Sequence, residues 1–230
     1  LATGSDAILL DVKCGSGAFM KKQADAEKLV FDILEHAMAH TGDPIEGDYL
    51  RWHYEGFDAD LPNSFLKDGK LYMTITYTMT YLTTAAQEAE MDSAVANLLN
   101  ALGVSQADDY TKLKAVYDFI CSDYKNTYLL KHTAYAALVN RTAVCQGYAT
   151  LLYRLALSLG VDCRLIPGRS NGDNHGWNIA ELDDLYYNLD STWDAGLSDK
   201  DYRYFLQNAE GFSDQNCNSY SGKPGCSSCR

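Results

Sequence analysis

The feature that most constrains the fold is a long helical pattern that runs directly into three short extended segments, within residues 145–193. In CQGYATLLYRLALSLG the apolar side chains recur at helical spacing, at Tyr148, Leu151, Leu152, Leu155 and Leu159. Three alternating segments follow, VDCRLIPG, HGWNIAEL and LYYNLDSTW. Because Asp183-Asp184 forms a tight turn between the last two, we expect these two strands to pair antiparallel.

The residues before this unit predict an accessory α/β region. The patterns indicate a helix over 21–40, strands over 49–57 and 70–82 with a turn at Asp68-Gly69 between them, and a helix from Thr84 to Gly103. We therefore expect an accessory region over 1–84, a core domain over 85–212 and a Cys-containing tail over 213–230.

The net charge of the chain excludes some classes of binding partner. Lys and Arg total 19 against 31 Asp and Glu, a formal net charge of −12, so nucleic acid and anionic membrane surfaces would repel the protein. No apolar run approaches the roughly 20 residues that cross a bilayer, which predicts a chain that does not span a membrane. Since the sequence shows no signal peptide and no initiator Met, we expect a mature, secreted or cell-surface protein of bacterial type whose targeting segment has been removed.

Seven cysteines leave at least one thiol unpaired. Cys121 and Cys163 continue apolar stripes, so we expect both in the core. Cys217, Cys226 and Cys229 crowd the tail, where either a disulfide or free thiols remain possible. A zinc site is not expected there, because it needs a fourth ligand that the neighbouring sequence lacks.

No other metal site is predicted. His36 and His40 lie four residues apart on a predicted helix, as metal ligands can. Without a carboxylate at ligand spacing on another element, we interpret both as solvated surface histidines. We therefore expect neither a metal ion nor an organic cofactor.

Cys145 has the setting of a nucleophile. It stands where the long helix begins, and the partial positive charge of a helix N-terminus favours a thiolate. Gly147 would leave the approach to the sulfur open. The backbone N–H of Cys145, which has no partner within the helix, could donate to an oxyanion.

A base and a group that orients it lie on the predicted hairpin. His175 begins a strand after the polar loop RSNGDN. With a turn at 183–184, position 175 faces a position near 192, so Asp190 can lie diagonally beside His175. A carboxylate there can accept from one ring nitrogen and leave the other to face the thiol. Spacing alone does not bring the hairpin and the helix together.

Three blocks stand in order along the chain: Cys-x-Gly-Tyr at Cys145, His-x-Trp at His175 and Asp-x-Thr-Trp-Asp at Asp190. With the upstream YDFICSDYKN at 117–126, the stretch of about 85–212 resembles the transglutaminase-like superfamily. Three linked blocks make this match specific, whereas C-x-G-Y alone would be weak. The resemblance implies an α+β fold with a papain-like core, in which the nucleophile helix packs on a small antiparallel sheet. It also implies Cys145 as nucleophile, His175 as base and Asp190 as the orienting group.

The chain departs from the family pattern in several places. Asn126 stands where a Tyr is common, with Tyr124 and Tyr128 beside it, which leaves the second oxyanion donor open. RTAVC replaces the Arg-Gly-Gly-x-Cys block of the arylamine acetyltransferase branch, which argues against acetyl-CoA chemistry. The paired C-x-x-C zinc motifs of the peptide N-glycanase branch are absent from the sequence.

Residues close to the three blocks are candidates for the substrate cleft, namely Trp177, Tyr148, Gly147, Trp193 and Tyr124. The two tryptophans could roof and dry a cleft or pack as core aromatics, and packing is the preferred interpretation. Tyr148 is expected to pack on the helix close to the nucleophile.

The resemblance implies thiol-dependent acyl transfer at an amide bond through an acyl-enzyme. Water as the second nucleophile would make the chain a cysteine peptidase or amidase, whereas a lysine amine would make it a transglutaminase that cross-links proteins. The residues leave both open, and hydrolysis is preferred by analogy. The expected partner is a protein or peptide, with cell-wall peptide as one option. The alternative is a non-catalytic peptide- or cell-wall-binding module that retains the fold.

Overall fold

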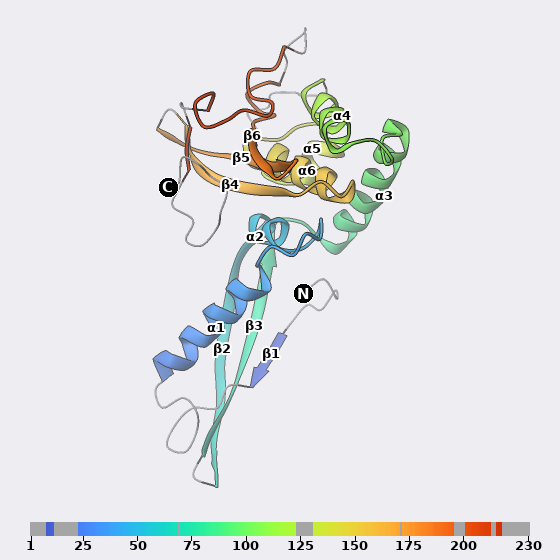
Figure 1. The fold of residues 1–230 in the computed structure, drawn as a ribbon. Coiled ribbons are helices and arrows are strands. Elements are labelled where there is room, and N and C mark those ends of the chain that lie inside the picture. Colours follow the sequence, from blue (N-terminus) through green and yellow to red (C-terminus); the bar gives the residue numbers. More distant parts are fainter. Residues whose placement is uncertain are drawn as a thin grey trace.

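A computed structural model describes residues 8–11, 23–68, 70–122, 131–170, 172–195, 201–212 and 215–217. Within these ranges the chain combines helices with two separate antiparallel sheets (Figure 1), which confirms the α+β class. The helices are α1 (Gln23–Ala37), α2 (Asp48–His53), α3 (Ala85–Leu102), α4 (Asp109–Ser122), α5 (Ala134–Leu138) and α6 (Cys145–Ser158). The strands are β1 (Ile8–Asp11), β2 (Tyr54–Lys67), β3 (Lys70–Tyr81), β4 (Cys163–Ser170), β5 (Asp173–Leu182), β6 (Leu185–Leu189) and β7 (Gln215–Cys217).

The first sheet is built around a long hairpin. Its strand order is β1-β3-β2, and β2 and β3 form a ribbon that projects away from the second sheet, with α1 lying along it (Figure 1). Lys67 pairs with Lys70, which places the predicted turn between these two residues. Asp68 adopts φ 51° there, in the left-handed region that a tight hairpin turn demands and that Asp tolerates better than most residues.

The second sheet has the strand order β6-β5-β4-β7 and carries the predicted hairpin. Leu182 pairs with Leu185, and Asp183 and Asp184 between them have φ 52° and 61°, as a two-residue turn with two left-handed positions requires. The register continues to Asn178 opposite Leu189. The predicted antiparallel pairing is therefore confirmed.

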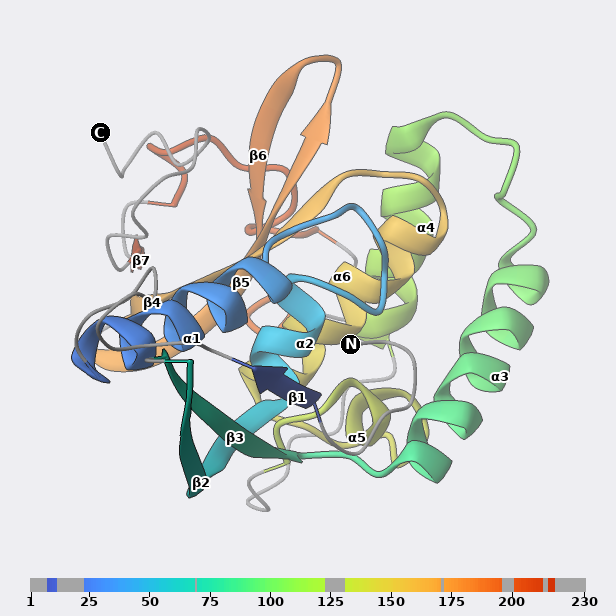
Figure 2. The same ribbon diagram turned by 90° about the horizontal axis from the view of Figure 1, so that it is seen from below.

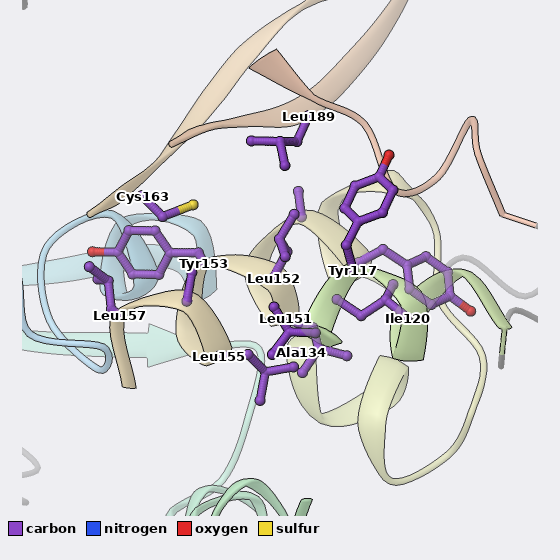
Figure 3. Close-up of a cluster of buried hydrophobic side chains, with 14 of the residues drawn as sticks. Tyr117, Ile120, Ala134, Leu151, Leu152, Tyr153, Leu155, Leu157, Cys163 and Leu189 are labelled. Atoms are coloured by element: carbon purple, nitrogen blue, oxygen red, sulfur yellow. The ribbon is translucent and has the colours of Figure 1, made fainter. Parts of the chain in front are cut away.

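The core surrounds α6, whose residues from Gly147 to Leu157 are all buried. Figure 3 shows Leu151, Leu152 and Leu155 of this helix among side chains from α4, α5 and β6. Cys121 and Cys163 are 2% and 0% exposed, which confirms both as core residues. A helix buried on this many sides must be covered by several elements, and α2, α4, α5 and the sheet provide that cover.

Residues 49–53 were expected in a strand, and the structure corrects this, because they lie in α2. Tyr49 and His53 are one helical turn apart, are both buried, and stack with ring centroids 4.1 Å apart. The ring nitrogen His53 Nδ1 lies 2.9 Å from the Tyr49 carbonyl oxygen. Tertiary burial of an i, i+4 pair thus overrides the strand preference of aromatic residues. The strand starts at Tyr54.

The second correction concerns His40, which was expected in solvent. His36 is exposed, but His40 is half-buried against the core domain. Its Nε2 lies 3.1 Å from Asp162 Oδ1 and its Nδ1 lies 3.3 Å from Tyr153 Oη. A helical periodicity cannot reveal such contacts, because their partners lie more than a hundred residues further along the chain.

Helix α2 joins the N-terminal residues to the core domain. Figures 1 and 2 both show it where the β2–β3 ribbon meets α6. The buried Asp48 carboxylate accepts hydrogen bonds from Arg164 Nε at 2.7 Å and from Arg164 Nη2 at 2.9 Å, which ties α2 to β4. The expected boundary between 1–84 and 85–212 stays a prediction, but α2 packs as part of the core. None of the described helices combines the length and apolar character that crossing a bilayer requires.

Arg164→Leu should lower the free energy of unfolding by about 3–5 kcal/mol, because the variant leaves the buried Asp48 carboxylate without its cation. Urea denaturation measures this change. The matched control is Glu35→Gln, which breaks the Arg51–Glu35 pair at 2.9 Å, where the Glu35 side chain is 64% exposed. That variant should cost less than about 1 kcal/mol. Equal losses in the two variants would contradict the role assigned to the Asp48–Arg164 pair.

Candidate active site

Cys145 is the first residue of α6 and is half-buried. Val144 caps the helix in an extended conformation, and its N–H donates to the Lys131 carbonyl at 2.9 Å, which fixes the entry of the chain. The N–H groups of Gly147 and Tyr148 bond back to the Val144 carbonyl at 3.0 and 3.2 Å. The sulfur therefore sits at a helix N-terminus, as the sequence predicts.

His175 and Asp190 are brought together by the β5–β6 hairpin. His175 Nε2 lies 2.6 Å from Asp190 Oδ2, and the side chains are only 8% and 1% exposed. The other carboxylate oxygen, Oδ1, accepts from the backbone N–H groups of Thr192 at 3.0 Å and Trp193 at 3.1 Å. Asp190 is thus held by a turn of its own loop, with one oxygen aimed at the imidazole.

The Cys145 thiol and the His175 imidazole interact, since each shifts the pKa of the other. Because Nε2 is taken by Asp190, Nδ1 is the ring nitrogen left for the sulfur. The structure therefore brings the predicted Cys145, His175 and Asp190 into one chain of contacts, although helix and hairpin come from separate parts of the fold.

The pKa values of the two reacting groups move in opposite directions. Burial raises the pKa of the Cys145 thiol, but the hydrogen bond and charge of His175, with the backbone N–H groups of Gly176 and Gln146, outweigh burial and bring the pKa below its usual value. Burial lowers the pKa of His175, but the hydrogen bonds and charges of Asp190 and Cys145 raise it to about 9. Both shifts favour a thiolate beside an imidazolium.

The other described cysteines have no such setting. Burial raises the pKa of Cys121 and of Cys163 well above the usual value, and the charges of Asp194 and Asp162, respectively, act in the same direction. Neither thiol has a histidine among the groups that shift it. Cys145 is therefore the thiol prepared for ionisation among the free cysteines that the structure describes.

Three of the cleft candidates differ in their exposure to solvent, namely Trp177, Trp193 and Tyr148. Trp177 is 2% exposed, and its indole N–H donates to Asn188 Oδ1 at 3.2 Å. Its ring lies nearly parallel to His175, with centroids 6.2 Å apart. Trp193 is half-buried, 5.7 Å from the His175 ring centroid. Tyr148 is 2% exposed in the core. Of these three, Trp193 is the side chain that is both near His175 and partly open to solvent; contact with substrate stays a prediction.

Gly147 packs closely against the loop that precedes α6. A Cβ on this residue would lie 2.6 Å from Ala143 Cβ and 2.9 Å from the Thr133 carbonyl oxygen. The glycine is therefore needed for close packing of α6 against the preceding loop, and its part in access to the sulfur stays a prediction. Tyr124 falls outside the described residues, as do Asn126 and Tyr128.

Sequence reasoning missed Trp52, Gly176 and Gln146. The Trp52 ring lies against Gly176, and the Trp52 carbonyl oxygen accepts from Gln146 Nε2 at 2.7 Å. One signal was available, because an isolated glycine inside a strand, here between His175 and Trp177, marks a close approach of another group.

Asp194, the last residue of the third block, has a supporting position. Its carboxylate accepts from the Tyr117 hydroxyl at 2.7 Å and from the backbone N–H groups of Arg203 and Tyr204, both at 2.9 Å. The Tyr204 carbonyl in turn accepts from the Asp190 N–H at 3.0 Å. Asp194 therefore anchors the segment that holds the Asp190 backbone.

In the described part of the chain, no group of three or more His, Cys, Asp or Glu side chains could hold a metal ion. The expectation that the chain needs no metal ion and no organic cofactor stays a prediction, since activity has yet to be measured with and without them.

Comparisons with known proteins find similarity to peptidases and to a transglutaminase. The kyphoscoliosis peptidases of Mus musculus and Homo sapiens are 27% and 26% identical over 139 and 140 residues, covering 51% and 52% of this chain. The chain spans only about a fifth of those proteins, 21% and 20% of their lengths. A crystal structure of a TGase covers 72% of this chain and 54% of its own, with a TM-score of 0.45 and 16% identity.

The family assignment comes from a sequence match over the core domain. The family described as the transglutaminase-like superfamily matches residues 96–212, which are 117 of the 230 residues. This range contains Cys145, His175 and Asp190, the three residues that the structure brings into contact. The chain belongs to the transglutaminase-like superfamily.

Proposed function

We propose that the chain catalyses thiol-dependent acyl transfer at amide bonds, with Cys145 as nucleophile, His175 as proton carrier and Asp190 as the residue that orients His175. The observation that carries this proposal is the contact chain from Sγ through the imidazole to the carboxylate, with the thiol pKa lowered and the imidazole pKa raised. An ion pair of this kind is an activated nucleophile with its acid already in place.

The reaction would run in two halves. The Cys145 thiolate attacks the carbonyl carbon of an amide and forms a tetrahedral oxyanion, to which the backbone N–H of Cys145 can donate. As the C–N bond breaks, the His175 imidazolium gives its proton to the leaving amine, and a thioester remains on Cys145. His175, now neutral, takes a proton from the second nucleophile, which attacks the thioester and releases the acyl group with the thiolate restored.

Asp190 would act through His175. Its Oδ2 holds the Nε2–H, which fixes the ring orientation so that Nδ1 points at the sulfur, and its charge stabilises the imidazolium. The backbone bonds to Oδ1 keep the carboxylate from turning away. Gln146 does not supply the second oxyanion donor in this arrangement, since its side-chain amide donates to Trp52.

Hydrolysis is the proposed outcome, with water as the second nucleophile and a protein or peptide as substrate. The relatives named as peptidases support this choice over transfer to an amine. The acidic chain, with a net charge of −12, also favours a peptide that is neutral or basic over an acidic one.

Incubation with a peptide library, with and without an added primary amine, tests the proposed reaction. Wild-type protein should release cleaved peptides in both cases, and Cys145→Ala should release none while keeping its fold. Cys163→Ala is the matched control: it removes a buried thiol that no histidine contacts, so it should keep the activity.

Three outcomes would contradict the proposal. Activity of Cys145→Ala within a factor of about ten of wild type would remove Cys145 as the nucleophile. Amine conjugates in place of cleaved peptides would replace hydrolysis by transamidation. Peptide that binds but is never cleaved would favour the non-catalytic binding module.

Asp190→Asn should reduce kcat by about 10²–10³, less than the loss on removing Cys145. Asn has nearly the same size, so packing survives, but it supplies no charge for the imidazolium and can present N–H to the ring. The loss should be smaller than in a serine triad, where the same change costs about 10⁴, because a thiol ionises more readily. The pKa of His175 should also fall, since a carboxylate that favours its charged form is gone. A wild-type rate with an unmoved pH profile would show that another residue orients His175.

A further inference from the structure

Trp52 touches the candidate active site in two ways. A Cβ built on Gly176 would lie 2.6 Å from both Trp52 Cη2 and Cζ3, so the indole ring packs directly on the Gly176 backbone. The Trp52 carbonyl oxygen also accepts a hydrogen bond from Gln146 Nε2 at 2.7 Å. One residue of α2 therefore contacts both the strand that carries His175 and the helix that carries Cys145.

The two residues that Trp52 contacts adjoin the two reacting residues. Gln146 follows Cys145 at the start of α6, Gly176 follows His175 in β5, and the backbone N–H group of each lowers the pKa of the Cys145 thiol. Such donors stabilise a thiolate only while they stay within hydrogen-bond distance and direction.

Gly176 has a paired strand on one side only, and the Trp52 ring covers its backbone. β6 pairs with β5 only from Asn178 to Leu182, so Gly176 lies beyond that paired stretch. On the other side β4 pairs with β5 without a break from Cys163 to Ser170, with Pro167 opposite Gly176. The Trp52 ring therefore restrains a glycine backbone that β6 does not reach.

We infer that Trp52 is a positioning residue, which fixes the Gly176 backbone beside His175 through its ring and the Gln146 side chain beside Cys145 through its carbonyl oxygen. The inference rests on the proposed function, in which Cys145 is the nucleophile. It gives the N-terminal region of the chain a direct part in the reaction, although Trp52 itself would not touch the substrate.

Alkylation of Cys145 by iodoacetamide, followed across pH by mass spectrometry of the peptide that contains it, tests the inference on the whole protein. Trp52→Phe removes the ring atoms that meet Gly176, and Gly176→Ala adds a methyl group where those atoms lie. Each single variant should slow alkylation at pH 6 about tenfold and move the pH midpoint upward by about one unit, as the loss or weakening of one charge-assisted hydrogen bond requires.

The double variant Trp52→Phe/Gly176→Ala provides the decisive comparison. The shorter phenylalanine ring leaves room for the alanine methyl group, so the double variant should alkylate faster at pH 6 than Gly176→Ala alone. Tyr49→Phe is the matched control on the same helix: it loses the buried hydroxyl that Arg154 Nη1 meets at 2.7 Å, so it should lower stability and leave the midpoint unchanged.

The outcomes separate this inference from the function on which it rests. Single variants with the wild-type pH profile, a double variant slower than both singles, or a midpoint moved equally by Tyr49→Phe would overturn the role of Trp52. A wild-type Cys145 that is inert at pH 6 would instead overturn Cys145 as an activated nucleophile, and the Trp52 inference would fall with it.

Discussion

A half-buried sulfur ionises only if other groups replace the water that it has lost, and the structure around Cys145 is arranged to meet that condition. Burial alone would hold the thiol protonated, as it does for Cys121 and Cys163. At Cys145 the imidazole of His175 and the backbone N–H groups of Gly176 and Gln146 outweigh the cost of burial. The opposite pKa shifts of Cys145 and of the two buried thiols therefore come from their surroundings.

These surroundings must be rigid, because the groups that act on the sulfur come from two elements, with His175 and Gly176 on β5 and Gln146 on α6. The helix α6 is held by apolar contacts over most of its length, which fixes the position of Cys145 at its N-terminus. The β5–β6 hairpin fixes His175 relative to Asp190, and α2 reaches between the two elements through Trp52. Much of the core packing thus serves to keep a few polar atoms in place.

The N-terminal residues are more closely tied to this site than their sequence indicates. The β2–β3 ribbon projects away from the core domain, yet α2, which precedes it directly, is bound to β4 by the bidentate Asp48–Arg164 pair. That pair fixes α2 one helical turn from Trp52. A change in the N-terminal region could therefore reach the sulfur through a single short helix.

Local patterns predicted the elements that depend on local chemistry. Thr84 and Gly103 cap α3 as expected, and the two-residue turn at Asp183 and Asp184 sets the register that brings Asp190 beside His175. The three motifs shared with the transglutaminase-like superfamily predicted Cys145, His175 and Asp190 as the site residues.

Local sequence patterns gave wrong or no predictions where contacts with distant residues determine the structure. Residues 49–53 have strand-like composition but form a helix because Tyr49 and His53 are buried together against the core. Gly147 and Gly176 are both needed for close packing, and no periodicity reveals which group will approach a glycine. The contacts of Trp52 could not be predicted for the same reason, since Gln146 and Gly176 lie about a hundred residues further along the chain.

The measurement that tests the central claim most directly is the titration of the His175 imidazole by NMR, in the wild-type protein and in Cys145→Ala. The pKa of His175 should be about 9 in wild type, because Asp190 and the Cys145 thiolate both favour the charged ring. It should fall in Cys145→Ala, where the thiolate is gone and Asp190 remains. A wild-type His175 that titrates at or below the ordinary value of about 6.5, or that is unmoved by the loss of Cys145, would contradict the thiolate–imidazolium pair.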